Sequence, residues 1–145
     1  FLQQHLEFKV ASAVGGLAAA SETSLKSFEL TFNRNTIFDN PLGTVEVNDI
    51  FAQDLSIEGS IELNLDDDTY RNFMKNGTYR AMEVFFDNGA SSSLQLQFPR
   101  VDFSEWDADY SLKEIAKQKV NFKANYDAAN ALQIISTCVL INTKV

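Results

Sequence analysis

The most regular pattern in the chain lies between Phe51 and Asp66, where apolar and polar residues alternate over sixteen positions. The odd positions are apolar apart from Gln53 and Gly59, and the even positions are polar except for Ala52. Successive side chains of a β-strand point to opposite faces, so this pattern predicts a strand with one buried and one solvated face. At about 3.3 Å per residue it would span roughly 50 Å, too long for one flat strand. We therefore expect a bend or bulge at Gly59 that passes the strand from one sheet to another.

The polar face of this stretch consists of serines, carboxylates and an asparagine. Its members are Asp54, Ser56, Glu58, Ser60, Glu62 and Asn64. A second long alternating stretch, residues 116–126, has a polar face of the opposite charge. That face consists of Lys117, Lys119, Asn121, Lys123 and Asn125. The two rows are competing candidates for one functional surface.

Shorter alternating stretches predict further strands. They lie at residues 5–14, 27–33, 44–49, 78–88, 94–98, 101–106 and 133–142. The small residues of segment 15–23 favour a loop, and residues 107–110 are expected to form a turn. Pro99 has no N–H group, so it should restrict its strand to an edge or end it.

One helix is expected at about residues 67–76. The preceding Asp66-Asp67-Asp68 suits a helix start, because carboxylates accept hydrogen bonds from free amides and oppose the helix dipole. Tyr70, Phe73 and Met74 form one apolar face, and Asn76-Gly77 predicts the end. Neighbouring helical carboxylates diverge by about 100 degrees, so a cap is favoured over a metal site. The fold class is mainly β, a β-sandwich or half-barrel of about nine strands with one short flanking helix.

Length and composition favour one domain over residues 1–145, since 145 residues with 45% hydrophobic content can bury a full core. The chain begins with Phe1, so we expect it to be a piece of a longer chain with an incomplete amino terminus. The net charge of −8 disfavours direct binding to phosphate backbones. Cys138 is the single cysteine, so no disulfide within the chain is expected.

Catalytic and metal-binding patterns are missing from the sequence. The sole histidine, His5, has no nucleophile motif to serve. Asp107-Ala-Asp109 resembles the start of a calcium loop but lacks the required glycine and terminal glutamate. Glu58 and Glu62 share a strand face, as paired glycosidase carboxylates can, although a solvated acidic row explains them better. We expect no enzyme activity, no cofactor and no metal. The apolar runs are also too short to cross a membrane.

The order of parts resembles the phage tail tube proteins of long-tailed phages. Three stretches give the likeness: DLSIEGSIELNL, then DDDTYRNFMKNG, then TYRAMEVFF with LQLQFPRVDF. The closing pair KVNFKANYD and LQIISTCVLIN resembles the terminal hairpin of that family. The likeness covers roughly residues 24–142. Tube proteins of secretion systems share this fold.

The resemblance implies a structural protein that self-assembles into rings, hexameric in the family, which stack into a tail tube through which DNA passes. It further implies contacts with other tail proteins, DNA only as passing cargo, and a place in the virion tail after assembly in the host cytoplasm. Two alternatives from other classes are the tube of a secretion or contractile injection machine and a non-catalytic carbohydrate-binding β-sandwich. The latter would need a row of exposed aromatics, for which Trp106, Tyr110 and Tyr79 are the candidates.

Two sets of residues are expected to serve such a tube. The stretch 81–86 is apolar on both faces, as in a strand buried on two sides, and it supplies the subunit-interface candidates Met82, Val84, Phe85 and Phe86. The acidic row Asp54–Asn64 is expected to face the channel, because lysines would grip DNA by salt-sensitive phosphate contacts. The lysine row is expected to face the outside or the acids of a neighbouring subunit.

Overall fold

The computed structural model describes residues 6–39, 42–43, 49–88, 92–110, 115–129 and 134–142. This part of the chain contains nine strands, one α-helix and one 3₁₀ helix, so the mainly β prediction is confirmed. The elements are β1 (Leu6–Ala11), η2 (Val14–Ala19), β2 (Leu25–Asn33), β3 (Thr36–Asp39), β4 (Asp49–Ala52), β5 (Ser56–Asn64), α1 (Thr69–Lys75), β6 (Arg80–Asp87), β7 (Ser92–Asp109), β8 (Lys117–Ala124) and β9 (Thr137–Asn142). His5 and most of the expected strand 44–49 lie outside the described residues.

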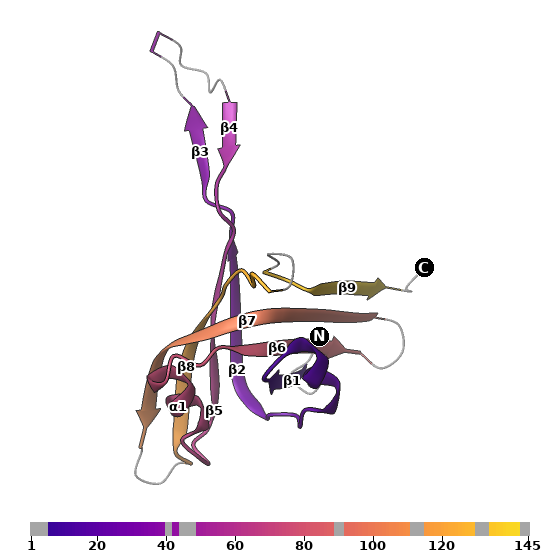
Figure 1. Ribbon diagram of the computed structural model, residues 1–145, viewed down its shortest axis with the longest axis vertical. Coiled ribbons are helices and arrows are strands. Elements are labelled where there is room, and N and C mark those ends of the chain that lie inside the picture. Colours follow the sequence, from indigo (N-terminus) through magenta and orange to yellow (C-terminus); the bar gives the residue numbers. More distant parts are fainter. Residues whose placement is uncertain are drawn as a thin grey trace.

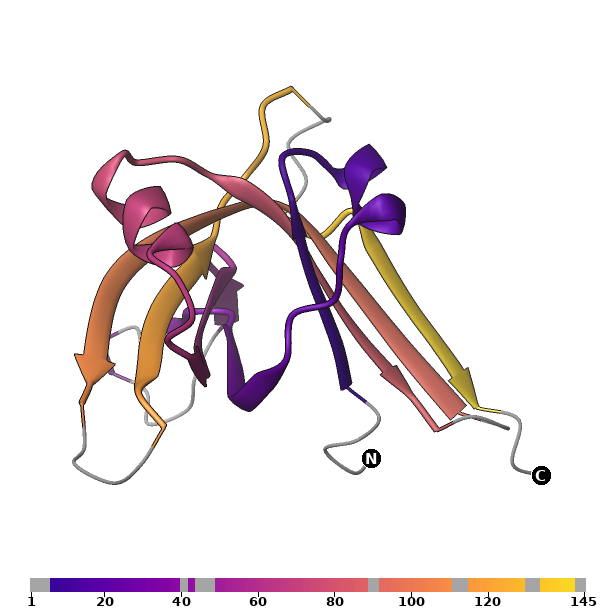
Figure 2. The ribbon, with the colours of Figure 1, turned by 90° about the horizontal axis from the view of Figure 1, so that it is seen from below.

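Seven strands form one antiparallel sheet in the order β1-β6-β7-β8-β5-β2, with β9 also paired to β7. Strand β7 is 18 residues long and joins the two halves of this sheet. Its first part pairs with β6 and β9, and its second part pairs with β8. The sheet curls around its apolar side into an open half-barrel (Figure 2). Strands β3 and β4 form a separate two-stranded sheet that stands away from this body (Figure 1).

The core fills the concave side of the curled sheet. Fully buried side chains come from strands of both halves, and they include Phe8, Ile57, Ile61, Met82, Val84, Phe98, Val101 and Val120. Helix α1 closes one end, where Tyr70 lies edge-on to Phe103 at a ring-centroid distance of 5.6 Å. The apolar face predicted for this helix is therefore confirmed.

The long alternating stretch is two strands rather than one. Strand β4 ends at Ala52, residues 53–55 are not in a strand, and β5 begins at Ser56. The expected bend at Gly59 is wrong, since Gly59 lies inside β5. A Cβ there would overlap the carbonyl oxygen of Glu29 and lie 2.7 Å from Cζ of Phe122. Glycine is needed at this position because a neighbouring strand and an aromatic ring approach the backbone closely.

Strand β7 runs through Pro99, contrary to the expected break there. Phe98 lies opposite Met82 and Val101 lies opposite Arg80, so the pairing with β6 shifts across Pro99. On the other side of β7, β9 pairing reaches Gln97 and β8 pairing starts at Val101. Proline is tolerated because no ladder bond needs its N–H at this irregular point. The turn expected at residues 107–110 is wrong as well, because β7 continues to Asp109.

Of the two short helices, η2 was not predicted and α1 was. Segment 15–23, expected as a loop, includes most of η2, whose Leu17 is fully buried against the body. The N-cap residue Asp68 forms no side-chain cap hydrogen bond, but the carboxylate of Asp67 before it accepts a 2.9 Å hydrogen bond from the N–H of Thr69 at the start of α1. Gly77 follows α1 with a φ of 58°, a left-handed conformation that glycine favours. Neither helix in the described ranges is long and apolar enough to span a membrane.

Candidate functional site

The outer side of the sheet half formed by β2, β5, β8 and the second part of β7 is a continuous polar surface, which we call the polar face. Antiparallel pairing puts Glu58 opposite Lys123 and Ser60 opposite Asn121. Side chains directly opposite each other on antiparallel strands lie on the same side of the sheet. The acidic row of β5 and the lysine row of β8 are therefore neighbours on one surface. The lysine row was expected to face the outside or the acids of a neighbouring subunit, but in the structure it lies beside the acids of its own chain.

Carboxylates flank the lysines on both sides. On β7, Asp102 lies opposite Lys123, Asp107 opposite Lys119 and Asp109 opposite Lys117. With β5 on the other side, the lysine row of β8 lies between two acidic rows. Among the residues of the polar face that are paired across β2–β5, β5–β8 and β7–β8, the charged ones are Glu29, Glu58, Glu62, Asp102, Glu105, Asp107 and Asp109 against Lys117, Lys119 and Lys123, a net charge of −4 for this set.

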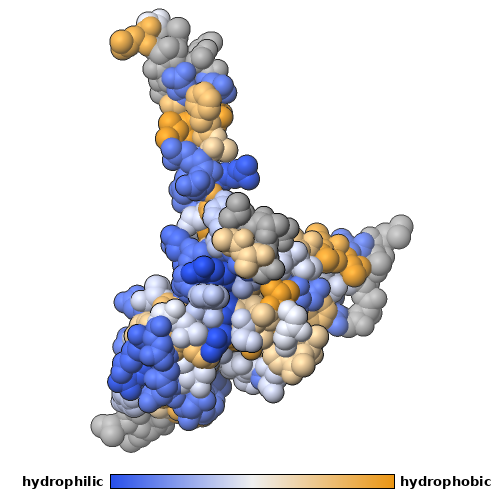
Figure 3. Space-filling model, in the orientation of Figure 1, coloured by the Kyte–Doolittle hydropathy of each residue, from blue (hydrophilic) through white to orange (hydrophobic). Residues whose placement is uncertain are grey.

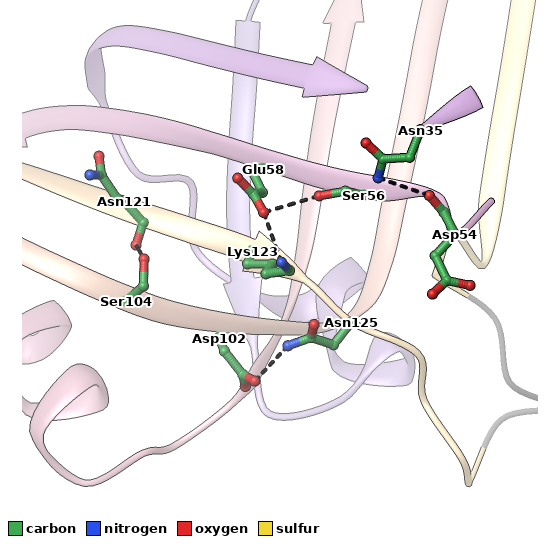
Figure 4. A network of polar contacts seen from close by, with 9 residues as sticks. All are labelled: Asn35, Asp54, Ser56, Glu58, Asp102, Ser104, Asn121, Lys123 and Asn125. Carbon is green, nitrogen blue, oxygen red and sulfur yellow. Dashed lines mark hydrogen bonds and ion pairs between the residues drawn. The ribbon is translucent and has the colours of Figure 1, made fainter. Parts of the chain in front are cut away.

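Polar contacts across the strands hold these side chains in place (Figure 4). The ammonium of Lys123 donates to Oε1 of Glu58 at 2.8 Å, and the hydroxyl of Ser56 donates to the same oxygen at 3.0 Å. These two hydrogen bonds, together with the positive charge of Lys123, lower the pKa of the exposed Glu58 carboxyl below its ordinary value. The amide of Asn125 donates to Asp102 at 2.7 Å.

The polar face has a hollow that extends across β5 and its two neighbours, β2 and β8. The hollow has a volume of about 570 Å³ and is lined by Glu29, Thr31, Asn33, Ser56, Glu58, Gly59, Ser60, Ser104, Lys119, Asn121, Phe122 and Lys123. Hydroxyls, amides and paired charges dominate this lining, and it contains no nucleophile beside a histidine base. In the part of the chain that the structure describes, no three histidine, cysteine or acidic side chains are grouped to hold a metal ion.

The six residues of the expected acidic row differ in their surroundings. Ser56, Glu58, Ser60 and Glu62 lie on the polar face of β5. Asp54 lies in the link before β5, where its carbonyl oxygen accepts a hydrogen bond from the side chain of Asn35. Asn64 is half-buried at the far end of β5, and its side-chain oxygen is buried without a hydrogen-bond partner.

Three of the four expected interface residues, Met82, Val84 and Phe86, pack into the protein's own core. Met82 and Val84 are 0% exposed, so neither is available to another subunit. Phe86 is half-buried and packs against the core, with its ring centroid 6.4 Å from that of Phe28. Phe85 is half-buried on the opposite face of the strand. One face of β6 meets the core through Met82, Val84 and Phe86, and the strand also contacts η2.

Sequence analysis did not single out the sheet of β3 and β4, which we call the arm. Ile37 lies opposite Phe51, and Phe38 lies opposite Ile50. These four side chains are 48%, 55%, 56% and 57% exposed respectively. Figure 3 shows hydrophobic side chains along this projection, clear of the body. The sequence contained a signal for the arm: four large apolar residues lie on either side of a predicted turn, and no neighbouring apolar stretch is available to cover them.

The aromatics required for a carbohydrate platform do not form one. Trp106 is half-buried, its indole N–H donates to Gln118 at 2.9 Å, and the guanidinium of Arg71 lies 5.2 Å from its ring centroid. The ring of Tyr79 is likewise covered by Arg100 at 4.3 Å. An arginine therefore lies over two of the three candidate rings, and Tyr110 is the most exposed of them at 71%, which does not favour a row of open aromatic rings.

Comparisons with known proteins agree on one kind of protein. The family model described as "Phage tail tube protein" matches residues 3–131. No curated protein sequence matches the chain.

Similar solved structures share the fold at low sequence identity. A chain from the tail of an empty gene transfer agent particle is 15% identical with a TM-score of 0.65, covering 85% of this chain and 92% of that one. The SPP1 tail tube protein is 7% identical with a TM-score of 0.67, covering 98% and 79%. A chain from the sheath/tube terminator of the PVC extracellular contractile injection system is 8% identical with a TM-score of 0.64, covering 97% and 95%.

Proposed function

The chain belongs to the phage tail tube protein family, and from this premise we propose that it self-assembles into stacked hexameric rings that form a tube through which DNA passes. Family membership gives the protein a structural role in the tail of the virion. We extend this role to the absence of catalysis and of any required metal or cofactor. The C6 symmetry of the similar gene transfer agent tail supports the ring size.

The arm is the observation that carries the self-assembly proposal. A two-stranded hairpin is marginally stable alone in water, and contiguous exposed apolar side chains mark contact sites. Ile37, Phe38, Ile50 and Phe51 are each about half exposed on a hairpin of this kind. Burying them against another copy would stabilise both the arm and the assembly. Other tail proteins are the partners expected at the ends of the tube.

The body supports a single tail-tube-like β domain over residues 1–145. Seven of the nine described strands, including β1 at one end of the chain and β9 at the other, share one sheet, and the core contains side chains from both halves of that sheet. A tube protein of a contractile injection machine is the second candidate function, favoured by the likeness to the PVC chain. No insertion into a membrane belongs to either proposal.

We assign the polar face to the channel. Its net charge of −4 repels a polyanion at short range. The lysines of β8 do not reverse this effect, because Glu58 pairs with Lys123 at 2.8 Å and Glu62 lies 3.7 Å from Lys117. A lysine that is already paired with a carboxylate binds a phosphate less favourably, because the existing ion pair must be broken first. DNA would therefore slide over this surface without being held.

Replacement of one arm residue tests self-assembly. Phe51→Asp puts a charge into the apolar surface of the arm, and we expect it to abolish rings and tubes in electron micrographs while the protein stays folded. Phe51→Leu retains an apolar side chain and should still assemble. Normal tubes from Phe51→Asp would remove the arm from the assembly contact, and only monomer from the complete, unaltered protein at high concentration would overturn the function itself.

A charge reversal tests the channel assignment. The double change Glu58→Lys, Glu62→Lys brings the polar face from −4 to neutral and frees Lys117 and Lys123 for phosphates. We expect tubes to assemble and genome delivery from intact particles to slow at low salt. The control double change Glu22→Lys, Asp68→Lys adds the same charge at exposed positions away from the polar face. Delivery at the normal rate by the first variant would show that this face does not line the channel.

A further inference from the structure

Strand β9 is an edge strand that lacks the usual protection against pairing. It pairs with β7 on one side, and no described strand pairs with its other side. Val139, Leu140 and Ile141 are 43%, 69% and 49% exposed. Cys138 is exposed as well. Natural proteins block such edges with lysines, prolines, bulges or a covering segment. The segment Cys138–Ile141 has no charge and no proline, and its register with β7 is regular.

The other edges of the sheet differ from β9. Beside β1, Glu22 forms a bridge with Lys9, and the N–H of Thr23 donates to the carbonyl of Phe8 at 2.8 Å. Strand β2 includes Lys26 and Glu29. Charged or covered edges resist the addition of a strand from another chain. Strand β9 is the edge whose composition favours such an addition.

We infer that β9 binds a strand of the arm from a second copy of this chain through main-chain hydrogen bonds. This inference rests on the proposed ring assembly. A ring is closed by heterologous contacts, in which two different surfaces of the same chain meet. The surface of the neighbouring copy that contacts β9 must therefore be different from β9 itself. The arm is suited to be that surface, because it is a two-stranded sheet with exposed apolar side chains.

Length and chemistry of the two elements agree. Strands β3 and β4 have four residues each, and the uncharged exposed segment of β9 also has four. The centre of each arm strand is apolar, Ile37-Phe38 in β3 and Ile50-Phe51 in β4. Adding a strand to a sheet edge pairs its open main-chain groups, while neighbouring side chains supply specificity. The aliphatic side chains of β9 would lie beside the isoleucine and phenylalanine side chains of the arm. In the orientation shared by Figures 1 and 3, hydrophobic side chains mark both the arm and the region of β9.

The single cysteine makes this contact testable by cross-linking. We would introduce one cysteine at a time at Thr36, Phe38, Ile50 or Ala52, assemble tubes, oxidise them and run the products on a non-reducing gel. Each chain then has one cysteine in the arm and Cys138 in β9. A head-to-tail contact links chain to chain repeatedly, so at least one position should give a ladder of multimers beyond the dimer. Thr36 and Ala52 keep all four large apolar arm residues, so their variants should assemble even where the others do not.

Controls separate this inference from the function on which it rests. Cys138→Ser in the cross-linking variant should abolish the ladder. Tyr110→Cys places a thiol at a 71% exposed position outside both elements and should give none. Tubes without a ladder from any of the four positions would overturn the arm–β9 contact and leave the tube function intact. A disulfide dimer from the unaltered chain would show that β9 meets its own copy, which also overturns it. An equal ladder from Tyr110→Cys would do the same, because it would indicate random collision. Failure of the unaltered protein to form tubes would overturn the proposed function, and this contact with it.

Discussion

The body and the arm contain the same kind of apolar strand in opposite surroundings. Ile61 of β5 and Val84 of β6 are 0% exposed, whereas Ile50 and Phe51 of β4 are 57% and 55% exposed. In the body, the curled sheet and α1 provide two layers that enclose the apolar side chains. The arm has two strands and no second layer, so its own fold buries little. A strand pattern thus predicts which side chains need a partner, and the architecture decides whether that partner is in the same chain.

This difference separates folding from assembly. Apolar burial contributes about 25 cal/mol per Å² removed from water. Body residues contribute that free energy when the monomer folds, and arm residues contribute it only when copies meet. Changes in the two regions should therefore alter different measurements.

The largest effect is expected from a charge placed in the core. Val84→Asp buries an unpaired carboxylate at a position with no exposure, and we expect it to lower the free energy of unfolding by about 4 kcal/mol or more. Phe51→Asp in the arm should change it by less than about 0.5 kcal/mol, as surface substitutions do. Urea unfolding of the dissociated protein followed by circular dichroism measures both. Similar destabilisation by the two variants would show that the arm packs as part of the monomer core.

An intermediate effect is expected from a methyl group at Gly59. Gly59→Ala puts a Cβ where the carbonyl oxygen of Glu29 and the ring of Phe122 leave no room, and overpacking of this kind costs about 1–3 kcal/mol. Gly15→Ala is the matched control, because a Cβ there has nothing within 4 Å. Thermal unfolding compares them. If both variants have the same Tm as the unaltered protein, the space between β2, β5 and Phe122 can accept a methyl group, and the close approach at Gly59 is contradicted.

The smallest effect concerns the polar face of the body. Lys123→Met removes the hydrogen bond and the charge that lower the pKa of Glu58, so that pKa should rise toward its ordinary value. A lowered folded-state pKa stabilises the native state above the unfolded-state pKa, near 4.5, and this stabilisation is lost as the pH falls through the folded value. Relative to the unaltered protein, the variant should therefore have a lower free energy of unfolding at neutral pH, and this difference should disappear at strongly acidic pH, where Glu58 is protonated in both proteins. Carboxyl NMR titration measures the pKa, with Lys26→Met as the control, and an unchanged Glu58 pKa in Lys123→Met would contradict the pairing.

The sequence by itself determined the local features of this protein. Alternation predicted the buried and wet sides of β5, and the aspartates, aromatic face and Asn76-Gly77 predicted α1 to within two residues at its start and one at its end. These features depend on the side-chain period of two in a strand and on capping chemistry, which act between near neighbours. The order of these elements was also enough to recognise the family.

Only the tertiary structure decided which strands are neighbours and which have a second layer. The lysines of β8 lie beside the acids of β5 because residues some sixty positions apart pair in one register, such as Glu58 with Lys123. Val84 is core and Phe51 is surface although both lie in apolar strands. Alternation records the two faces of a strand, but it contains no information on what lies across from a face. That depends on long-range pairing and on the curl of the whole sheet, which no local pattern specifies.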